Sequence, residues 1–293
     1  MCVRVYLFMI LITGSSGQLG SYIIENLPNS IGLDIKPSKY TDIVFDLRKK
    51  PEDILKNYEL STIVHAAAQV SVVKSVEAPI FDAENNIMGT LNLLEYARRH
   101  DIEQFIYISS AAVYGEPKYL PIDEEHPTVP KSPYGLSKLT GERYSLMYNE
   151  LYGIPVAAIR PFNIFSKRQD PSSPYSGVIS VFVHRARKRL PLIIYGDGKQ
   201  TRDFVNVYDV VQLIKLVMKR RAIGIYNCGT GKETSINDLA KLIIELSGRD
   251  LEIIYDKPRE GDIKRSYADI SRALNIGYTP KTNLKEDLKR YFF

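Results

Sequence analysis

The chain has 293 residues, of which 44% are hydrophobic and 25% are charged, and its net charge is +5. This length and composition fit a globular protein with one large domain or two moderate ones and argue against a disordered chain. The basic residues are scattered rather than gathered in runs, which argues against nucleic-acid binding.

The cysteines and the first residues exclude several further classes. Cys2 and Cys228 form neither a CxxC pair nor a cluster with histidines, so we expect no metal site and a reducing, cytoplasmic setting. The apolar stretch from Met1 to Ile12 leads directly into a glycine loop, so we interpret it as a buried strand and not a signal peptide. No stretch approaches the roughly 20 apolar residues that span a bilayer, and we expect no membrane partner.

Short apolar runs alternate with amphipathic stretches along the first half of the chain. Such alternation is typical of βαβ units and a parallel sheet. The continuous apolar run at residues 105–108 fits a strand that is covered on both faces. In chain order, we predict strands at 5–12, 31–34, 62–65, 105–109 and 156–160, and helices at 18–27, 87–99 and 134–152.

The pattern changes after Asn163. Residues 169–177 are rich in Pro, Ser and Gly and are predicted to form a loop. A smaller C-terminal region follows, with helices predicted at 178–188, 236–247 and 284–291. The predicted fold class is α/β, with a Rossmann-type doubly wound parallel sheet and a smaller C-terminal α/β substrate domain.

A glycine loop joins the first predicted strand to the first helix. Gly14, Gly17 and Gly20 give the spacing G-x-x-G-x-x-G, which allows a tight turn and brings backbone N–H groups to a pyrophosphate. Asp34 follows Gly14 by about 20 residues, as the ribose-binding acid of a dinucleotide fold does. Its carboxylate repels a 2′-phosphate, so we predict NAD, with NADP as the alternative because Lys36 is close. The competing interpretation is an ordinary turn and a surface aspartate.

Tyr134 and Lys138 form a Y-x-x-x-K motif on the predicted helix 134–152. Positions four apart share a helix face, so the ammonium lies near the phenol. A free tyrosine has a pKa near ~10, and a neighbouring ammonium and a cationic nicotinamide lower it, which favours a general base. Alone, the motif is weak, because such pairs occur more often on surfaces.

Ser110 ends an apolar strand, where open α/β sheets bind ligands. Its hydroxyl is placed to bond the oxygen on which charge develops, and the alternative is a serine that satisfies its own backbone. The glycine loop, the strand-end serine and the Y-x-x-x-K motif occur in this order, which argues against coincidence. We predict Tyr134, Lys138 and Ser110 as the catalytic residues.

These motifs resemble the extended short-chain dehydrogenase/reductase family, and most closely its UDP-hexose 4-epimerases, including those that act on N-acetylated sugars. The similarity runs from Leu11 to Ala268. It implies an NAD-binding domain at 1–163, with 203–229 packing back onto it, and a nucleotide-sugar-binding domain at 164–293. The matching pieces are TGSSGQLGS, Asp34, Asp46-Leu47, HAAAQ at 65–69, NIMGT at 86–90, SSAAVYG, SPYGLSK, RPFN at 160–163, YGDG at 195–198, RDF at 202–204 and PREGD at 258–262.

The resemblance implies an NAD site that includes both catalytic-helix residues. Asp46 and Leu47 would hold the adenine, and Lys138 would bond the nicotinamide ribose. The implied cofactor-binding residues are Gly14, Ser16, Gly17, Gln18, Leu19, Gly20, Asp34, Lys36, Asp46, Leu47, Ala66, Ala67, Ala68, Asn86, Ser109, Tyr134, Lys138 and Pro161.

The resemblance also implies a UDP-sugar substrate. Arg202 and Arg259 would clamp its phosphates, a task that suits guanidinium geometry, and surface ion pairs are the alternative. Asp262 would bond the uridine ribose, and Ile194 and Tyr195 would flank the uracil. The implied substrate-binding residues are Ser110, Tyr134, Asn163, Val178, Tyr195, Arg202, Arg259, Asp262 and Ser266.

Three departures from the family pattern refine the expected reaction. Ala111 and Ala112 stand where 4,6-dehydratases carry Asp-Glu, which argues against elimination of water. Ser166-Lys167 replaces a common Gly-Pro, so the conformation of that loop is open. Ser266 stands where some glucose- and galactose-restricted relatives carry tyrosine, which leaves room for an N-acetyl group unless other residues set the pocket size.

We therefore predict an NAD-dependent UDP-hexose 4-epimerase. It would interconvert UDP-glucose and UDP-galactose, and also the N-acetylated pair, by transient oxidation at C4. The alternatives are a UDP-glucuronate epimerase or decarboxylase of the same family and a non-catalytic NAD-binding sensor. In similar proteins the helices that correspond to 87–99 and 134–152 form a dimer bundle, so we expect a homodimer.

Overall fold

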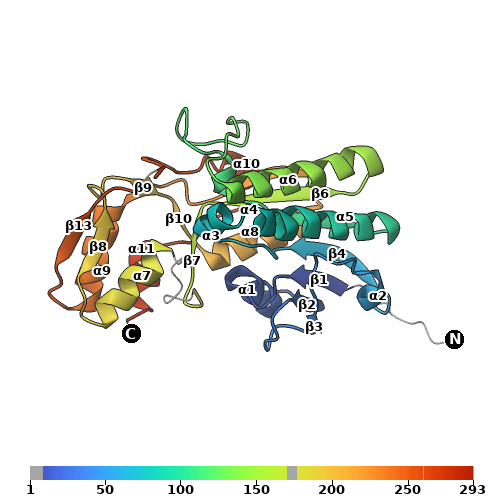
Figure 1. Cartoon of the computed structure of the whole chain (residues 1–293), viewed down its shortest axis with the longest axis horizontal. Helices are drawn as coiled ribbons and strands as arrows, with labels where there is room; N and C mark the ends of the chain where they lie inside the picture. Colours follow the sequence, from blue (N-terminus) through green and yellow to red (C-terminus); the bar gives the residue numbers. More distant parts are fainter. Residues whose placement is uncertain (1–8, 170–176, 260, 293) are drawn as a thin grey trace.

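A central parallel sheet of seven strands forms the larger part of the molecule. The computed structural model describes residues 9–169, 177–259 and 261–292. The strand order is β11-β6-β5-β4-β1-β2-β3, which runs outward in both directions from β1 and β4 (Figure 1). This is the predicted doubly wound arrangement. The strands are β1 (Met9–Thr13), β2 (Ser30–Asp34), β3 (Ile43–Val44), β4 (Leu60–His65), β5 (Gln104–Ile108), β6 (Val156–Pro161) and β11 (Gly224–Cys228).

Helices cover both faces of this sheet because its central strands are apolar on both sides. Along β5, Ile106 packs into one core and Phe105 into the other, as alternate residues of a strand must. The first core includes residues of α1 (Gln18–Asn26) and α8 (Val207–Arg220). The second includes residues of α5 (Gly89–Arg99) and α6 (Pro133–Tyr152).

After β6 the chain leaves the central sheet, and it returns to this sheet as β11. Strand β7 (Asn163–Phe165) pairs with β10 (Phe204–Asn206), and β11 then pairs in parallel with β6. Between them, α8 packs against α1 in the same apolar core. Strand β11 therefore joins the central sheet and α8 joins its core, whereas β10 pairs with β7 outside that sheet. The domain boundary at residue 163 stays a prediction.

The C-terminal region has an apolar core of its own. Strands β8 (Leu192–Tyr195) and β13 (Ile253–Asp256) pair in parallel. Around them pack α7 (Val178–Arg187), α9 (Ile236–Ser247) and α11 (Leu284–Lys289). Figure 1 shows this group at the end of the molecule that carries the C-terminus, away from the edge strand β3. A short antiparallel pair, β9 (Thr201–Arg202) and β12 (Thr234–Ser235), lies in the same half.

The predicted helix at 87–99 begins differently in the structure. Helix α4 (Pro79–Ala83) continues through a π-helical turn, η1 (Glu84–Met88), into α5. The turn surrounds the buried Asn86, whose carbonyl accepts a hydrogen bond of 2.6 Å from the Thr90 hydroxyl. Apolar periodicity does not reveal such a turn, because it depends on polar contacts of a single residue.

Several short elements had no sequence prediction. They contain too few residues for an apolar period to be recognised. Residues 5–8 of the first predicted strand and 170–176 of the predicted loop lie outside the described residues. The short unpredicted helices besides α4 are α2 (Glu52–Leu55), α3 (Val72–Glu77), η2 (Ala111–Val113) and α10 (Ser271–Asn275). Helix α8 also had no prediction, although its 14 residues are long enough to show an apolar period.

Candidate active site

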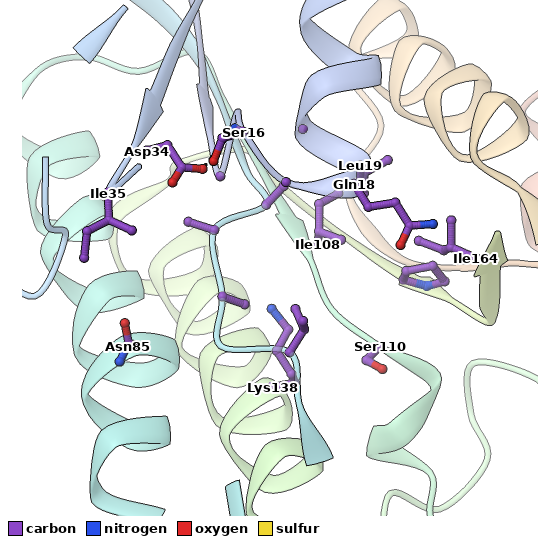
Figure 2. A pocket seen from close by; sticks show the side chains of 18 of the residues that line it. Ser16, Gln18, Leu19, Asp34, Ile35, Asn85, Ile108, Ser110, Lys138 and Ile164 are labelled. Carbon is purple, nitrogen blue, oxygen red and sulfur yellow. Dashed lines mark hydrogen bonds between the residues drawn. The ribbon is translucent and has the colours of Figure 1, made fainter. Parts of the chain in front are cut away.

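A cavity of about 660 Å³ lies at the carboxyl ends of the parallel strands. This volume is typical of sites for small ligands and cofactors, and the strand ends are where open α/β sheets bind them. We call it the cleft. Figure 2 shows Asp34 and Ser16 toward one end and Ser110 and Lys138 toward the other.

The glycine loop forms one wall of the cleft through close backbone packing. Gly14 has φ +72°, and a Cβ there would lie 2.7 Å from the nitrogen of Ala67. A Cβ on Gly20 would lie 2.0 Å from the Gly14 carbonyl oxygen. No side chain caps the N-terminus of α1, and Gln18 Nε2 is buried without a partner among the described residues. Unpaired donors in this position suit a pyrophosphate.

Two carboxylates stand at the same end of the cleft. Asp34 Oδ2 accepts a hydrogen bond of 3.0 Å from the Ser16 nitrogen, and its Oδ1 accepts one of 2.9 Å from the Lys36 nitrogen. Asp46 accepts two side-chain hydrogen bonds of 3.0 Å and one of 2.6 Å from Arg48. These bonds lower the pKa of Asp46, so the carboxyl is ionised at neutral pH.

Tyr134 and Lys138 lie one turn apart at the start of α6, and both line the cleft. The helix starts there because Ser132 caps it, accepting a bond of 3.1 Å from the Gly135 nitrogen. Lys138 is 3% exposed, and its ammonium lies 4.2 Å from the centre of the Tyr107 ring. Burial lowers the pKa of Lys138 to about 7, against the opposing effect of nearby carboxylates.

The side chain of Tyr134 is partly buried in the wall of the cleft. Burial raises its pKa, and a hydrogen bond with Ser110 acts in the opposite direction. Ser110 Oγ accepts a bond of 3.1 Å from the Ala112 nitrogen, which caps η2, so its own hydroxyl hydrogen is available to another acceptor. Ser110 therefore satisfies the local backbone and also lines the cleft, and its bond to the reacting oxygen stays a prediction.

A buried histidine fixes the segment that carries the three alanines of the cleft. His65 Nδ1 lies 2.7 Å from Thr13 Oγ1, and its Nε2 lies 3.0 Å from Thr90 Oγ1. Burial lowers the pKa of His65 to about 3, so the ring is neutral at pH 7. Thr13 also accepts a bond of 3.2 Å from the Ala67 nitrogen. This ring therefore joins β1, β4 and α5 beneath Ala66, Ala67 and Ala68.

The structure brings all predicted cofactor residues except one to the cleft. Asn86 does not line it. Its amide is buried and bonded to the Gln69 backbone, to Asp82 and to Ser137. The neighbouring Asn85 lines the cleft instead. Successive residues of a helical turn point in different directions, which separates the two neighbours.

The predicted substrate residues divide between two places. Ser110, Tyr134 and Asn163 line the cleft. Tyr195, Arg259 and Asp262 line a second hollow in the C-terminal region, where the Arg259 guanidinium lies 4.1 Å from the centre of the Tyr195 ring. The remaining three, Arg202, Val178 and Ser266, line neither.

Arg202 is engaged within the protein. Its guanidinium pairs with Asp262 and donates to the carbonyls of Thr201 and Ile263 at 2.8 and 2.7 Å. This is the ion-pairing alternative to a phosphate clamp, and it holds Asp262 at the edge of the second hollow. Ser266 is buried, and its proposed role as a gate for an N-acetyl group stays a prediction.

Sequence reasoning missed several residues of the cleft wall. Most flank predicted positions, as Phe45 and Arg48 flank Asp46 and Leu47. Their place next to a motif could therefore have predicted them. Gln169 and Gly177 come from beyond Asn163 and had no such signal. The missed lining residues are Leu33, Ile35, Phe45, Arg48, Val70, Asn85, Ile108, Phe162, Ile164, Gln169 and Gly177.

The described ranges offer neither a metal site nor a membrane-spanning helix. Residues 9–169, 177–259 and 261–292 contain no group of three or more His, Cys, Asp or Glu side chains placed to hold a metal ion. None of the helices in these ranges combines the length and apolar character needed to cross a membrane.

Comparison with known protein families agrees with the geometry of the cleft. A model of the NAD dependent epimerase/dehydratase family matches residues 10–229. The chain belongs to this family. Its members include a putative UDP-glucose 4-epimerase of Methanocaldococcus jannaschii, which is 46% identical over 299 residues and 96% of each chain.

Solved structures show the same relationship. A UDP-N-acetylglucosamine 4-epimerase from Methanobrevibacter ruminantium, in complex with UDP-N-acetylmuramic acid, has 33% identity and a TM-score of 0.92 over 97% of each chain. A UDP-glucose 4-epimerase from Thermus thermophilus, in complex with NAD, has 33% identity and a TM-score of 0.90 over 97% of this chain and 99% of that one.

NAD is the cofactor of this family, as the sequence predicted. The residues present fit it. Gly14 and Gly20 let the loop that we call the cradle pack closely, since a Cβ on either would collide with neighbouring backbone. The unpartnered Gln18 Nε2 and the uncapped end of α1 offer donors to a pyrophosphate. Asp34, fixed by Ser16, presents a carboxylate to ribose hydroxyls.

Gly20→Ala should weaken NAD binding by about tenfold or more, equivalent to ~1.4 kcal/mol, because its Cβ would push the Gly14 carbonyl out of place. Calorimetric titration with NAD measures this effect. The matched control is Gly89→Ala, another helical glycine, whose Cβ would meet nothing closer than 3.6 Å. Equal NAD affinity in the two variants would contradict the role of the cradle.

Proposed function

We propose that this chain is an NAD-dependent 4-epimerase of UDP-hexoses, acting on the glucose/galactose pair and on the N-acetylated pair. The observation that carries the proposal is the convergence of Tyr134, Lys138 and Ser110 on the cleft that also holds the glycine loop. The relatives named as UDP-glucose and UDP-N-acetylglucosamine 4-epimerases support it.

The side chains of the cleft suit proton transfer at one hydroxyl. Tyr134, as phenolate, takes the proton of the sugar 4-hydroxyl, and Lys138 stabilises that phenolate. Ser110 donates a hydrogen bond to the same oxygen, whose charge changes during the reaction. Bound NAD supplies the hydride acceptor and donor for C4. The 4-keto sugar then rotates to present its other face, and Tyr134 returns the proton to the 4-oxygen of the opposite epimer.

The 4-keto sugar can rotate in the site only if the enzyme binds the nucleotide firmly and the hexose weakly. Tyr195 and Arg259 form a stacked pair in the second hollow, and Asp262 is held beside them by Arg202. We assign the uridine diphosphate to these residues and to Asn163. Ala111 and Ala112, in η2 beside Ser110, bring no carboxyl group for the elimination of water.

Tyr134→Phe should lower kcat by about 10²–10⁴-fold, because the variant lacks the proton acceptor, while NAD stays bound. The measurement is the anomeric proton signal in NMR spectra after addition of UDP-galactose, with bound NAD determined in parallel. Tyr152→Phe, an exposed tyrosine at the end of the same helix and outside the cleft wall, is the matched control and should keep full activity.

A wild-type protein that binds NAD but forms no UDP-glucose or other product would contradict the epimerase and favour the non-catalytic sensor. A fully active Tyr134→Phe variant would contradict the catalytic assignment.

The charges of the cleft favour neutral sugars over uronic acids. Among the described residues of its wall, the cations are Lys36, Arg48 and Lys138. Lys36 adjoins Asp34, and Arg48 is paired with Asp46, both at the dinucleotide end. Lys138 belongs to the reacting centre. A uronate carboxylate would therefore lie in the cleft without a cation of its own.

A panel of UDP-sugars should show turnover of UDP-galactose and UDP-N-acetylgalactosamine. UDP-galacturonate should be turned over about 100-fold less efficiently in kcat/KM, because its carboxylate lacks a partner. Product identification by NMR settles each case. Preference for the uronate would replace this proposal with the UDP-glucuronate epimerase alternative, and loss of carbon dioxide would replace it with the decarboxylase.

We further propose a homodimer formed through α5 and α6. Five large hydrophobic side chains of α6 are exposed, and all but Tyr152 lie at spacings of eight, three and four residues, which places those four on one stripe. Such a stripe is typical of a buried helix face. The residues are Leu136, Tyr144, Met147 and Leu151.

The double variant Met147→Glu/Leu151→Glu should be monomeric, because two charges would interrupt the stripe. Light scattering after gel filtration gives the mass directly. Lys241→Glu, on the distant helix α9, is the control and should remain dimeric. A monomeric wild-type protein would contradict the proposal.

The free, buried Cys228 is consistent with the cytoplasmic setting that we propose for the enzyme.

A further inference from the structure

A cluster of buried and partly buried polar side chains lies behind the reacting centre and has no role in the steps above. It consists of Asp82, Asn86, Gln69 and Ser137, which we call the Asp82 cluster. Asp82 Oδ1 accepts hydrogen bonds of 2.8 Å from Gln69 Nε2 and 3.1 Å from Asn86 Nδ2. Asn86 Nδ2 also lies 3.0 Å from Ser137 Oγ, on the residue that precedes Lys138.

The carboxylate of Asp82 is incompletely satisfied. It is 1% exposed, and its Oδ2 has no hydrogen-bond partner among the described residues. Gln69 and Asn86, which bond its Oδ1, are neutral amides. A buried carboxylate without a cation is costly and is kept where it acts on a nearby charge.

The nearby charge is the ammonium of Lys138. Helices α3 and α4 pack directly against α6, which brings Asp82 and Lys138 to facing elements. The two carboxylates that raise the pKa of Lys138 are Glu142 first and Asp82 second. Glu142 is already paired with Arg160, whereas the bonds to Asp82 come from uncharged groups.

Other titratable and charged side chains face Lys138 from the elements packed around it. Tyr134 and Glu142 share its helix, Tyr107 lies beneath it on β5, and the neutral His65 stands on β4. Arg160, on β6, lies behind Glu142 and neutralises it. Asp82 is thus the carboxylate near Lys138 that has no charged partner among the described residues.

We propose that Asp82 is a positioning residue that keeps Lys138 protonated in the cleft, with its cluster fixing the start of α6 through Asn86 and Ser137. This inference rests on the proposed roles of Tyr134 and Lys138. Asp82 itself contacts neither substrate nor cofactor. Its negative charge compensates part of the burial of the ammonium.

The sign of the effect follows from electrostatics. Removal of a negative charge makes every nearby acid release its proton more easily. Asp82 raises the pKa of both Lys138 and Tyr134. In Asp82→Asn, the rising limb of the pH–rate profile, set by Tyr134, and the falling limb, set by Lys138, should therefore both move to lower pH. A purely structural defect would lower the rate at all pH values without this displacement.

The test uses the NAD-loaded enzyme and two readouts. The first is the pH profile of kcat with the UDP-hexose that it turns over, which should move down by about 1 pH unit in Asp82→Asn. The second needs no turnover: an NMR titration of protein with ¹³C-labelled lysine ε-carbons, in which the Lys138 signal is assigned by its absence from Lys138→Arg. Its midpoint should fall by a similar amount.

Two variants separate charge from shape. Asp82→Glu keeps the charge and should restore the wild-type midpoint, and Asp82→Ser removes the charge with less bulk and should shift it as Asp82→Asn does. Asp53→Asn, the same change at a fully exposed carboxyl, should shift neither readout.

An unchanged lysine midpoint in a folded Asp82→Asn or Asp82→Ser variant would overturn the inference. A shifted midpoint in an enzyme that turns over no UDP-sugar would leave the inference standing and overturn the proposed function. The two failures are therefore distinguishable.

Discussion

A buried ion pair between Glu142 and Arg160 connects the reacting helix to the sheet. The two side chains are 0% and 1% exposed, and they share bonds of 2.6 Å (Nη2–Oε1) and 2.9 Å (Nε–Oε2). Ser109 Oγ donates to the same carboxylate at 2.7 Å. Removal of one partner from such a pair costs about 3–5 kcal/mol, because the other charge stays buried alone. The position of α6 relative to the end of β5, and with it that of Tyr134 relative to Ser110, depends on this contact.

The same arginine also links the sheet to the returning chain. Arg160 Nη1 donates to the Tyr114 hydroxyl at 2.8 Å, and that hydroxyl donates to Asn227 Oδ1 at 2.6 Å. Asn227 lies on β11, the strand that the chain adds to the sheet after its excursion into the C-terminal region. A network of satisfied polar groups inside the core thus holds together segments far apart in sequence.

Arg160 and Lys138 are both buried cations, but their pKa values are shifted in opposite directions. Burial opposes the charge of Arg160, but its bonds to Glu142 raise its pKa above that of a free guanidinium, so it is a permanent structural charge. Burial lowers the pKa of Lys138 to about 7 despite the opposing charges of Glu142 and Asp82, and no described carboxylate forms an ion pair with its ammonium. The first arrangement suits a fixed joint. The second suits a group whose charge responds to the proton on Tyr134, as the proposed mechanism requires.

The sequence by itself determined the elements and motifs that depend on local pattern. Apolar periods placed the long helices α6 and α9 and the buried strands, and the glycine spacing placed the loop whose close packing is seen at Gly14 and Gly20. The Y-x-x-x-K spacing placed two side chains on one face of a helix.

Only the tertiary structure decided which partners the polar side chains take. Asn86 turned away from the cleft to bond Asp82 and Ser137, and Arg202 was engaged by Asp262 and two carbonyls. Gln169 reached the cleft wall from beyond the sheet. Such contacts join residues far apart in the chain, and their energies depend on burial and on competing partners, which local periodicity does not contain.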